Sequence, residues 1–130
     1  MEGHVPRVWW VLVAGLLLTG TACSRHRSEE PQPVGSPVRI EVRNKYGLPM
    51  EVYAVGAGTR YRLGVVHPGM LSQFVVPNTV LGSGPVEFQA QPSATSGELA
   101  RSGPLLLSPG TVVDFVIGAR LFNSTATIRP

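Results

Sequence analysis

From position 38 onward, hydrophobic and polar residues alternate along the chain with a period of two. The alternation begins in residues 38–43, and residues 50–55 repeat it after a turn at 44–49. A Gly-Ala-Gly hairpin signal at 56–58 leads into a third alternating segment, 59–66. Successive side chains of a strand point to opposite faces, so each segment predicts a strand with one buried and one solvated face.

Shorter segments, separated by turns rich in glycine and proline, continue this pattern to the C-terminus. The further expected strands are residues 71–76, 86–91, 112–117 and about 124–129, with room for one short edge strand near 98–101. The apolar segment 105–107 precedes the turn at 108–111. No helical pattern of useful length follows residue 22. Seven or eight short strands with regularly spaced turns favour two packed sheets over a closed barrel. The sequence therefore predicts an all-β antiparallel sandwich in residues 38–130.

The first 22 residues have a different character. A short segment that ends in arginine precedes an apolar run at residues 8–18, and small residues follow at 19–22. The apolar run has 11 residues, whereas a membrane-spanning helix needs about 20. We therefore expect residues 1–22 to be an export signal peptide.

The end of this segment reads LLLTGTACS over residues 16–24 and resembles the lipobox of bacterial lipoproteins, in which small residues precede a cysteine. In that family the thiol is alkylated by a diacylglycerol donor, and signal peptidase leaves the modified cysteine as the new N-terminus. The resemblance implies a lipid on Cys23. The chain departs from the family at Gly20, where an aliphatic residue is preferred, so ordinary cleavage with an unmodified Cys23 stays open. As the only cysteine in the sequence, Cys23 has no partner for an internal disulfide, and lipidation explains its presence.

Residues 24–37 lack apolar periodicity and are rich in Ser, Glu, Pro and Gly. We expect residues 23–37 to be a lipidated N-terminus and flexible linker, reaching roughly 40 Å at about 3 Å per residue. By the same resemblance, Ser24 after the cysteine favours the periplasmic face of the outer membrane if the organism has two membranes. The sequence leaves the envelope type open.

Composition and charge agree with an exported β-domain. Hydrophobic residues make up 43% of the chain and charged residues 15%, with 15 Gly and 12 Pro, as in short strands joined by tight turns. The formal charge is +3, but the basic residues are interspersed and exported proteins rarely meet nucleic acid. We expect no nucleic-acid partner, and an anionic membrane or cell-wall polymer is the better electrostatic partner.

Residues suited to catalysis or metal binding are few. Outside the first 22 residues, the histidines are His26 in the linker and His67 before a turn, and no serine lies in a nucleophile elbow. We expect the acidic residues that alternate with apolar residues on strands to face solvent with ordinary pKa values. Asp114 is the exception, because it interrupts an apolar run, and we expect it to take an outward position on its strand. Its neighbours Val113, Phe115 and Ile117 are expected to face inward. The sequence predicts no catalytic residue, no metal site and no cofactor.

Four arginines occupy polar positions of two expected strands. Arg39 and Arg43 share one face of the first strand, and Arg60 and Arg62 share one face of the third. If these faces adjoin, the arginines form a basic patch that contacts anionic headgroups, lipopolysaccharide or wall polymer. The alternative is pairing across strands with Glu41 and Glu51. The other residues that this interpretation involves are Tyr53, expected beside the patch, and Tyr61, Leu63 and Val65, expected together on the opposite face of the third strand.

In general outline, residues 38–130 resemble immunoglobulin-like sandwich modules. The segments VYAV at 52–55 and RLGVV at 62–66 also resemble small bacterial lipoproteins, although that likeness carries no known activity over. We expect a membrane-anchored, non-enzymatic binding or assembly module of the cell envelope that contacts another envelope protein through a sheet face or an exposed edge strand. The alternative is a glycan- or lipid-binding module that uses loops or a basic sheet face. Both tryptophans lie in the first 22 residues, which weakens the alternative.

Overall fold

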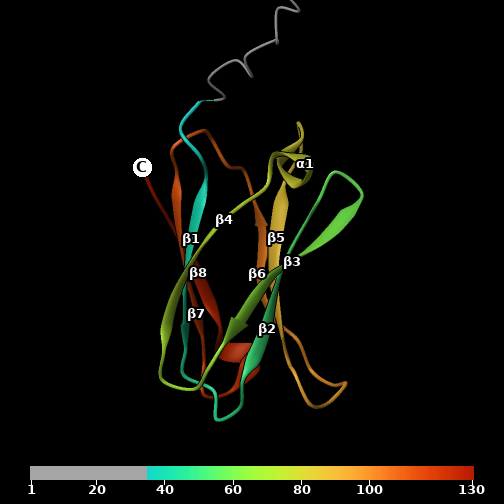
Figure 1. The fold of residues 1–130 in the computed structure, drawn as a ribbon, viewed down its shortest axis with the longest axis vertical. Coiled ribbons are helices and arrows are strands. Elements are labelled where there is room, and N and C mark those ends of the chain that lie inside the picture. The colour runs from blue at the N-terminus through green and yellow to red at the C-terminus, as the bar shows by residue number, and fades with distance from the viewer. Residues whose placement is uncertain (1–34) are drawn as a thin grey trace, which may run out of the picture. The chain divides into compact units, whose positions relative to one another are not determined.

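The computed structural model describes residues 35–130, which form a sandwich of two four-stranded sheets (Figure 1). One sheet has the order β4-β1-β7-β8 and is called sheet A; the other has the order β3-β2-β5-β6 and is called sheet B. Their strands are β1 (Arg39–Asn44), β2 (Met50–Gly56), β3 (Thr59–Val66), β4 (Leu71–Val75), β5 (Val86–Pro92), β6 (Ala100–Leu105), β7 (Val112–Ile117) and β8 (Thr125–Arg129). The predicted all-β sandwich is confirmed. The expected signal peptide, Cys23 and nearly all of the linker lie outside the described residues.

Sheet A contains one parallel pair, which differs from the expected purely antiparallel arrangement. β1 and β7 run side by side in the same direction, with Arg39 opposite Val112. Parallel neighbours need a long crossover, and here the chain visits sheet B between these two strands. In an immunoglobulin constant domain, by contrast, the first strand pairs with the second. The likeness to that fold therefore extends to the two packed sheets but not to the strand order.

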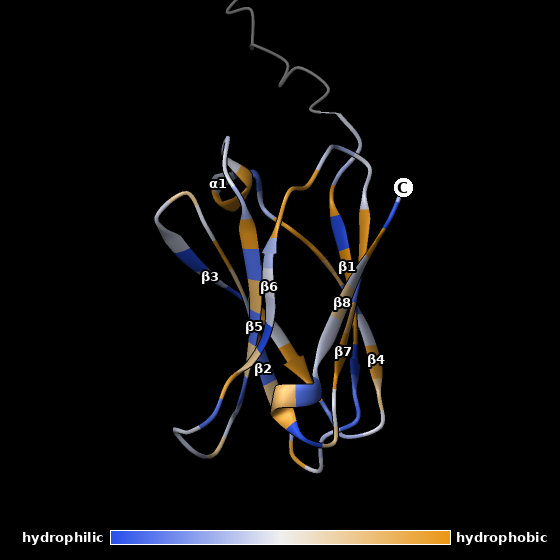
Figure 2. Cartoon of the chain, turned by 180° about the vertical axis from the view of Figure 1, so that it is seen from behind, coloured by the Kyte–Doolittle hydropathy of each residue, from blue (hydrophilic) through white to orange (hydrophobic). Residues whose placement is uncertain are grey.

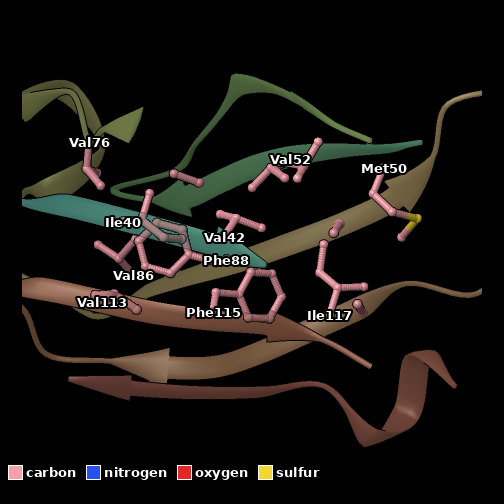
Figure 3. Packing of buried hydrophobic residues seen from close by; sticks show 14 of the residues in the cluster. Ile40, Val42, Met50, Val52, Val76, Val86, Phe88, Val113, Phe115 and Ile117 are labelled. Atoms are coloured by element: carbon pink, nitrogen blue, oxygen red, sulfur yellow. The ribbon is translucent and has the colours of Figure 1, made fainter. Parts of the chain in front are cut away.

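The core lies between the sheets and is built from the residues that the alternation placed inward. Phe88 of β5 and Phe115 of β7 meet there, among valines of β1, β2 and β7 (Figure 3). Val113, Phe115 and Ile117 are buried as predicted. Apolar and polar residues alternate along β5 in Figure 2, which matches its burial pattern.

A β-bulge shifts the register of β3 and changes which of its residues face outward. Val52 is opposite Gly64, but the next residue, Tyr53, is opposite Arg62, so Leu63 is the extra residue. The two halves of β3 consequently alternate out of phase. Val65 shares the outer face with Arg62, and the expectation that Tyr61, Leu63 and Val65 lie on one face is wrong.

The connections follow the predicted turns, with small differences. Ala57 and Gly58 have φ values of 49° and 72°, as a two-residue hairpin between β2 and β3 requires. The loop expected at 77–85 contains one helical turn, α1 (Asn78–Leu81), and a 3-10 turn, η2 (Leu121–Asn123), precedes β8. The short edge strand expected near 98–101 is replaced by the longer strand β6. Among the described residues, no helix is long and apolar enough to cross a bilayer.

Candidate functional site

The four candidate arginines lie on two different sheets. Arg39 and Arg43 belong to β1 in sheet A, whereas Arg60 and Arg62 belong to β3 in sheet B. On each sheet the arginines are exposed on the outer face, and the outer faces of a sandwich point in opposite directions. The four side chains therefore do not form one basic patch, because the two faces do not adjoin.

On sheet B, the arginines pair with neighbouring strands. Arg62 lies 3.4 Å from Glu51 (Nη2 to Oε1), and the guanidinium of Arg60 lies 3.6 Å from the ring centroid of Tyr53. Tyr53 donates its hydroxyl hydrogen to Glu51 at 2.6 Å. This hydrogen bond is the main reason why the pKa of Glu51 lies below its usual value and the pKa of Tyr53 above its own. The alternative interpretation, pairing across strands with a glutamate, is confirmed for Arg62, whereas Arg60 contacts the ring of Tyr53 instead of a carboxylate.

On the outer face of sheet A, one arginine bridges two carboxylates. Glu41 and Asp114 lie opposite each other on β1 and β7. Arg129 of β8 donates to Glu41 at 2.8 Å and makes two hydrogen bonds to Asp114. Asp114 faces outward as predicted. Its pKa is lowered, chiefly by the hydrogen bonds from Arg129. The pKa of Glu51 is lowered as well, so the expected ordinary pKa value is wrong for Glu51.

A shallow hollow of about 390 Å³ covers this carboxylate pair and extends to β4, one of the two edge strands of sheet A. Its lining includes Arg43 and Leu71 beside the three charged residues above. Sequence reasoning did not single out Arg129 or Leu71. Their placement depends on which strands are neighbours, and residue periodicity carries no information about that.

β4 differs in composition from the other edge strands. Its sequence is LSQFV, without charge, glycine or proline, and among the described residues it pairs only with β1. Each of the other edge strands carries at least one arginine, and β6 also contains Gly103 and Pro104. Charged residues and proline are features that protect edge strands from pairing with another chain. β4 lacks both of these protections (Figure 2, at the right-hand edge).

The outward side chains of β4 are exposed and largely apolar. Leu71 is 52% exposed and Val75 is 58% exposed, and Gln73 lies between them on the same face. Gln73 donates to Glu41 at 3.3 Å, which connects the edge strand to the carboxylate pair. The edge therefore presents two apolar side chains with an amide between them.

The backbone N–H and C=O groups of β4 at positions 71, 73 and 75 point toward the free edge of the strand. Hydrogen bonds from Asn44 N to Met70 O and from Val76 N to Val38 O mark the hydrogen-bonded pairs at the two ends of the β1–β4 ladder. Such pairs alternate with non-bonded pairs in an antiparallel ladder, so the even-numbered residues of β4 bond to β1. The N–H and C=O groups of Leu71, Gln73 and Val75 consequently face away from β1, along the free edge.

Other chemistry is sparse in the part of the chain that the structure describes. His67 is exposed in the turn that precedes β4, and within residues 35–130 no three His, Cys, Asp or Glu side chains gather as a metal site would require. A scan against protein-family models and a search of curated proteins find no match to this chain. The edge strand β4 is thus the best-defined candidate site.

Proposed function

We propose that this chain is a non-enzymatic binding module of the cell envelope, anchored by a lipid on Cys23, that binds a partner by strand addition at β4. The observation that carries the proposal is the uncharged edge strand, whose backbone groups at positions 71, 73 and 75 point toward the free edge and whose Leu71 and Val75 side chains are exposed. In strand addition, backbone hydrogen bonds provide affinity and alternate side chains provide specificity. β4 offers both along five residues.

The surroundings of β4 indicate the character of the added strand. Leu71 lies opposite Arg43, and Val75 lies opposite Arg39, on the neighbouring strand β1. A partner strand with apolar side chains on the corresponding face would bury the two exposed residues of β4. The linker predicted for residues 23–37 would let the domain turn the free edge of β4 toward another envelope protein.

A glycan ligand has less support than a protein strand. Sugar rings stack best on the large faces of tryptophan, and residues 35–130 contain no tryptophan. The basic sheet face that would attract anionic lipid or polymer is divided between two opposite surfaces. The strand-addition proposal needs neither feature.

Photo-crosslinking in intact envelopes tests the site. A photoreactive amino acid replaces Gln73 in the full-length chain, and a matched variant carries it at Thr127, which is exposed on the outer face of the other edge strand of sheet A. We expect protein adducts from position 73 and few from position 127. Equal labelling at both positions, or adducts from neither, contradicts strand addition at β4.

The anchor needs a separate measurement. Mass spectrometry of the N-terminal peptide is expected to find acyl chains on Cys23, and the Cys23→Ser variant is expected to leave the membrane fraction. A chain that retains residues 1–22 with an unmodified thiol, or that stays in the soluble fraction, contradicts the envelope anchor.

A further inference from the structure

Building on the proposed strand addition, we infer that the strand added to β4 is β4 of a second copy of this chain. The two strands pair antiparallel around a two-fold axis at Gln73, which joins the two A sheets into one continuous sheet. Such an interface is isologous, because each copy contributes the same surface.

The backbone geometry selects this register. A two-fold axis at Gln73 places Leu71 of one copy opposite Val75 of the other, and Gln73 opposite its own counterpart. In every one of these pairs, both residues direct their N–H and C=O groups toward the shared edge, as a hydrogen-bonded antiparallel pair requires. If the register shifts by one residue, the N–H and C=O groups that face the free edge of one copy lie opposite residues of the other copy whose N–H and C=O groups already bond to β1. If the register shifts by two residues, each copy has one residue whose backbone groups face the free edge but find no counterpart within the other β4. The axis at Gln73 thus satisfies the most backbone groups.

The side chains are complementary to themselves in the same register. Leu71 and Val75 are 52% and 58% exposed in a single copy. In the pair, Leu71 of one copy packs against Val75 of the other, and apolar cross-strand pairs of this kind stabilise a sheet. The two Gln73 amides meet at the axis, and each carries a donor and an acceptor. No charged side chain of β4 opposes another, since the strand has none.

The nearest arginines do not oppose this pairing strongly. Arg43 of one copy lies in the same row as Arg39 of the other, with the two β4 strands between them. Three strand spacings separate their Cα atoms by about 14 Å. That distance exceeds the Debye length of about 8 Å at physiological ionic strength, so solvent ions screen the repulsion.

Antiparallel pairing turns the two copies in opposite directions, and the predicted linker accommodates this. β3, which has 8 residues, would extend about 27 Å at 3.4 Å per residue. The roughly 40 Å reach expected for the linker is longer than this. Two copies anchored in one membrane can therefore form the pair.

Charge substitution at the axis tests self-pairing. Full-length Gln73→Lys and Gln73→Glu chains, each with a different tag, are solubilised from membranes in mild detergent and compared with the wild type by analytical ultracentrifugation. We expect a wild-type dimer, a self-association at least tenfold weaker for either variant alone, and restored association in the equimolar mixture. Thr127→Lys and Thr127→Glu serve as matched controls and are expected to dimerise like the wild type.

Three outcomes overturn the inference: a monomeric wild type, charge variants that dimerise normally, or a mixture that stays monomeric. Gln73→Glu also places a carboxylate beside Glu41, to which Gln73 donates, so circular dichroism checks the fold of each variant. A Gln73→Cys chain provides an independent measurement if that variant fails to fold. Hydrogen-bonded antiparallel pairs have Cα atoms about 5.5 Å apart, which lies within the range that a disulfide bridges. We therefore expect a disulfide-linked dimer from Gln73→Cys under mild oxidation, and none from Thr127→Cys.

The two proposals fail in different ways. If position 73 crosslinks to other envelope proteins while the wild type is a monomer, strand addition stands and self-pairing is wrong. If position 73 crosslinks to nothing and the wild type is a monomer, both are wrong. A wild-type dimer that forms a disulfide through Thr127→Cys but not through Gln73→Cys places the interface on β8 and contradicts both.

Discussion

Arg129 holds Asp114 through two hydrogen bonds, from Nε to Oδ2 at 2.5 Å and from Nη2 to Oδ1 at 2.7 Å. The same Nη2 atom reaches Glu41, which lies 88 positions away along the chain. Two carboxylates on adjacent strands repel each other unless a cation lies between them. Arg129 therefore ties the last strand to the first and offsets part of the negative charge of the carboxylate pair at the centre of sheet A.

Replacement of Arg129 by Gln is expected to raise the pKa of Asp114 toward its ordinary value. A carboxyl group whose pKa is lowered by folding contributes stability above its unfolded pKa, and loses that contribution as the pH falls through its folded pKa. Wild type is thus expected to be more stable than Arg129→Gln near neutral pH, with a difference that shrinks below about pH 4. Urea denaturation over a pH series measures it. A difference that stays constant into strong acid contradicts the assigned cause.

Asn44 is a fully buried polar residue at the end of β1. Its Nδ2 donates to the carbonyls of Leu48 at 2.8 Å and Val66 at 2.9 Å, and its Oδ1 accepts from Tyr46 N at 2.9 Å. Asn44→Ala leaves these groups without partners and is expected to cost about 2–4 kcal/mol of unfolding free energy. Asn78→Ala, at an exposed position, is the control and is expected to change stability by less than about 0.5 kcal/mol. Equal effects of the two substitutions would contradict the role assigned to Asn44.

Gly64 of β3 lies against the ring of Phe74 of β4. A Cβ atom at this position would lie 2.6 Å from a ring carbon of Phe74. Gly64→Ala is expected to destabilise the fold by about 1–3 kcal/mol through overpacking. Gly47→Ala, which would meet no atom within 4 Å, serves as the control. Because the clash involves the ring of Phe74, we expect Gly64→Ala to cost less unfolding free energy in a chain that also carries Phe74→Leu. Denaturation of the wild type, the two single variants and the double variant measures this coupling.

Local patterns predicted the strands, because alternation with a period of two is a property of neighbouring residues. The segment 112–117 was located to the residue, and Asp114 was correctly placed on its outer face. The bulge at Leu63 was missed, although an isolated glycine within a strand, such as Gly64, is a known signal for a bulge or a close approach. Asn44 was assigned to a turn, since Asn is typical of turns and its burial depends on the neighbouring sheet.

The candidate site was harder to foresee than the strands that form it. β4 is an edge strand only because β1 pairs with β7 on its other side, and that parallel pairing joins segments far apart in the sequence. The same pairing brings Glu41 opposite Asp114. The arginine patch failed for a related reason: Arg39 and Arg60 lie on the first and third segments of the alternating pattern, and the chain crosses from one sheet to the other between β1 and β2. Sheet order arises from packing of the whole domain, so periodicity alone cannot supply it.

Tyr53 is expected to make stability decline at alkaline pH. Its pKa is raised, first by the hydrogen bond it donates to Glu51 and next by desolvation, so the fold favours the neutral phenol. A group of this kind contributes stability below its unfolded pKa of about 10 and loses it as the pH rises through the folded pKa. Tyr53→Phe keeps a ring for Arg60 to stack on but removes the hydroxyl group, so this variant is expected to lose less stability than wild type above pH about 10. Loss of the hydroxyl is also expected to raise the pKa of Glu51, because the hydrogen bond from Tyr53 is the largest cause of its lowering. Urea denaturation at alkaline pH and carboxyl NMR titration measure the two effects, and parallel pH profiles for wild type and Tyr53→Phe would contradict the assigned hydrogen bond.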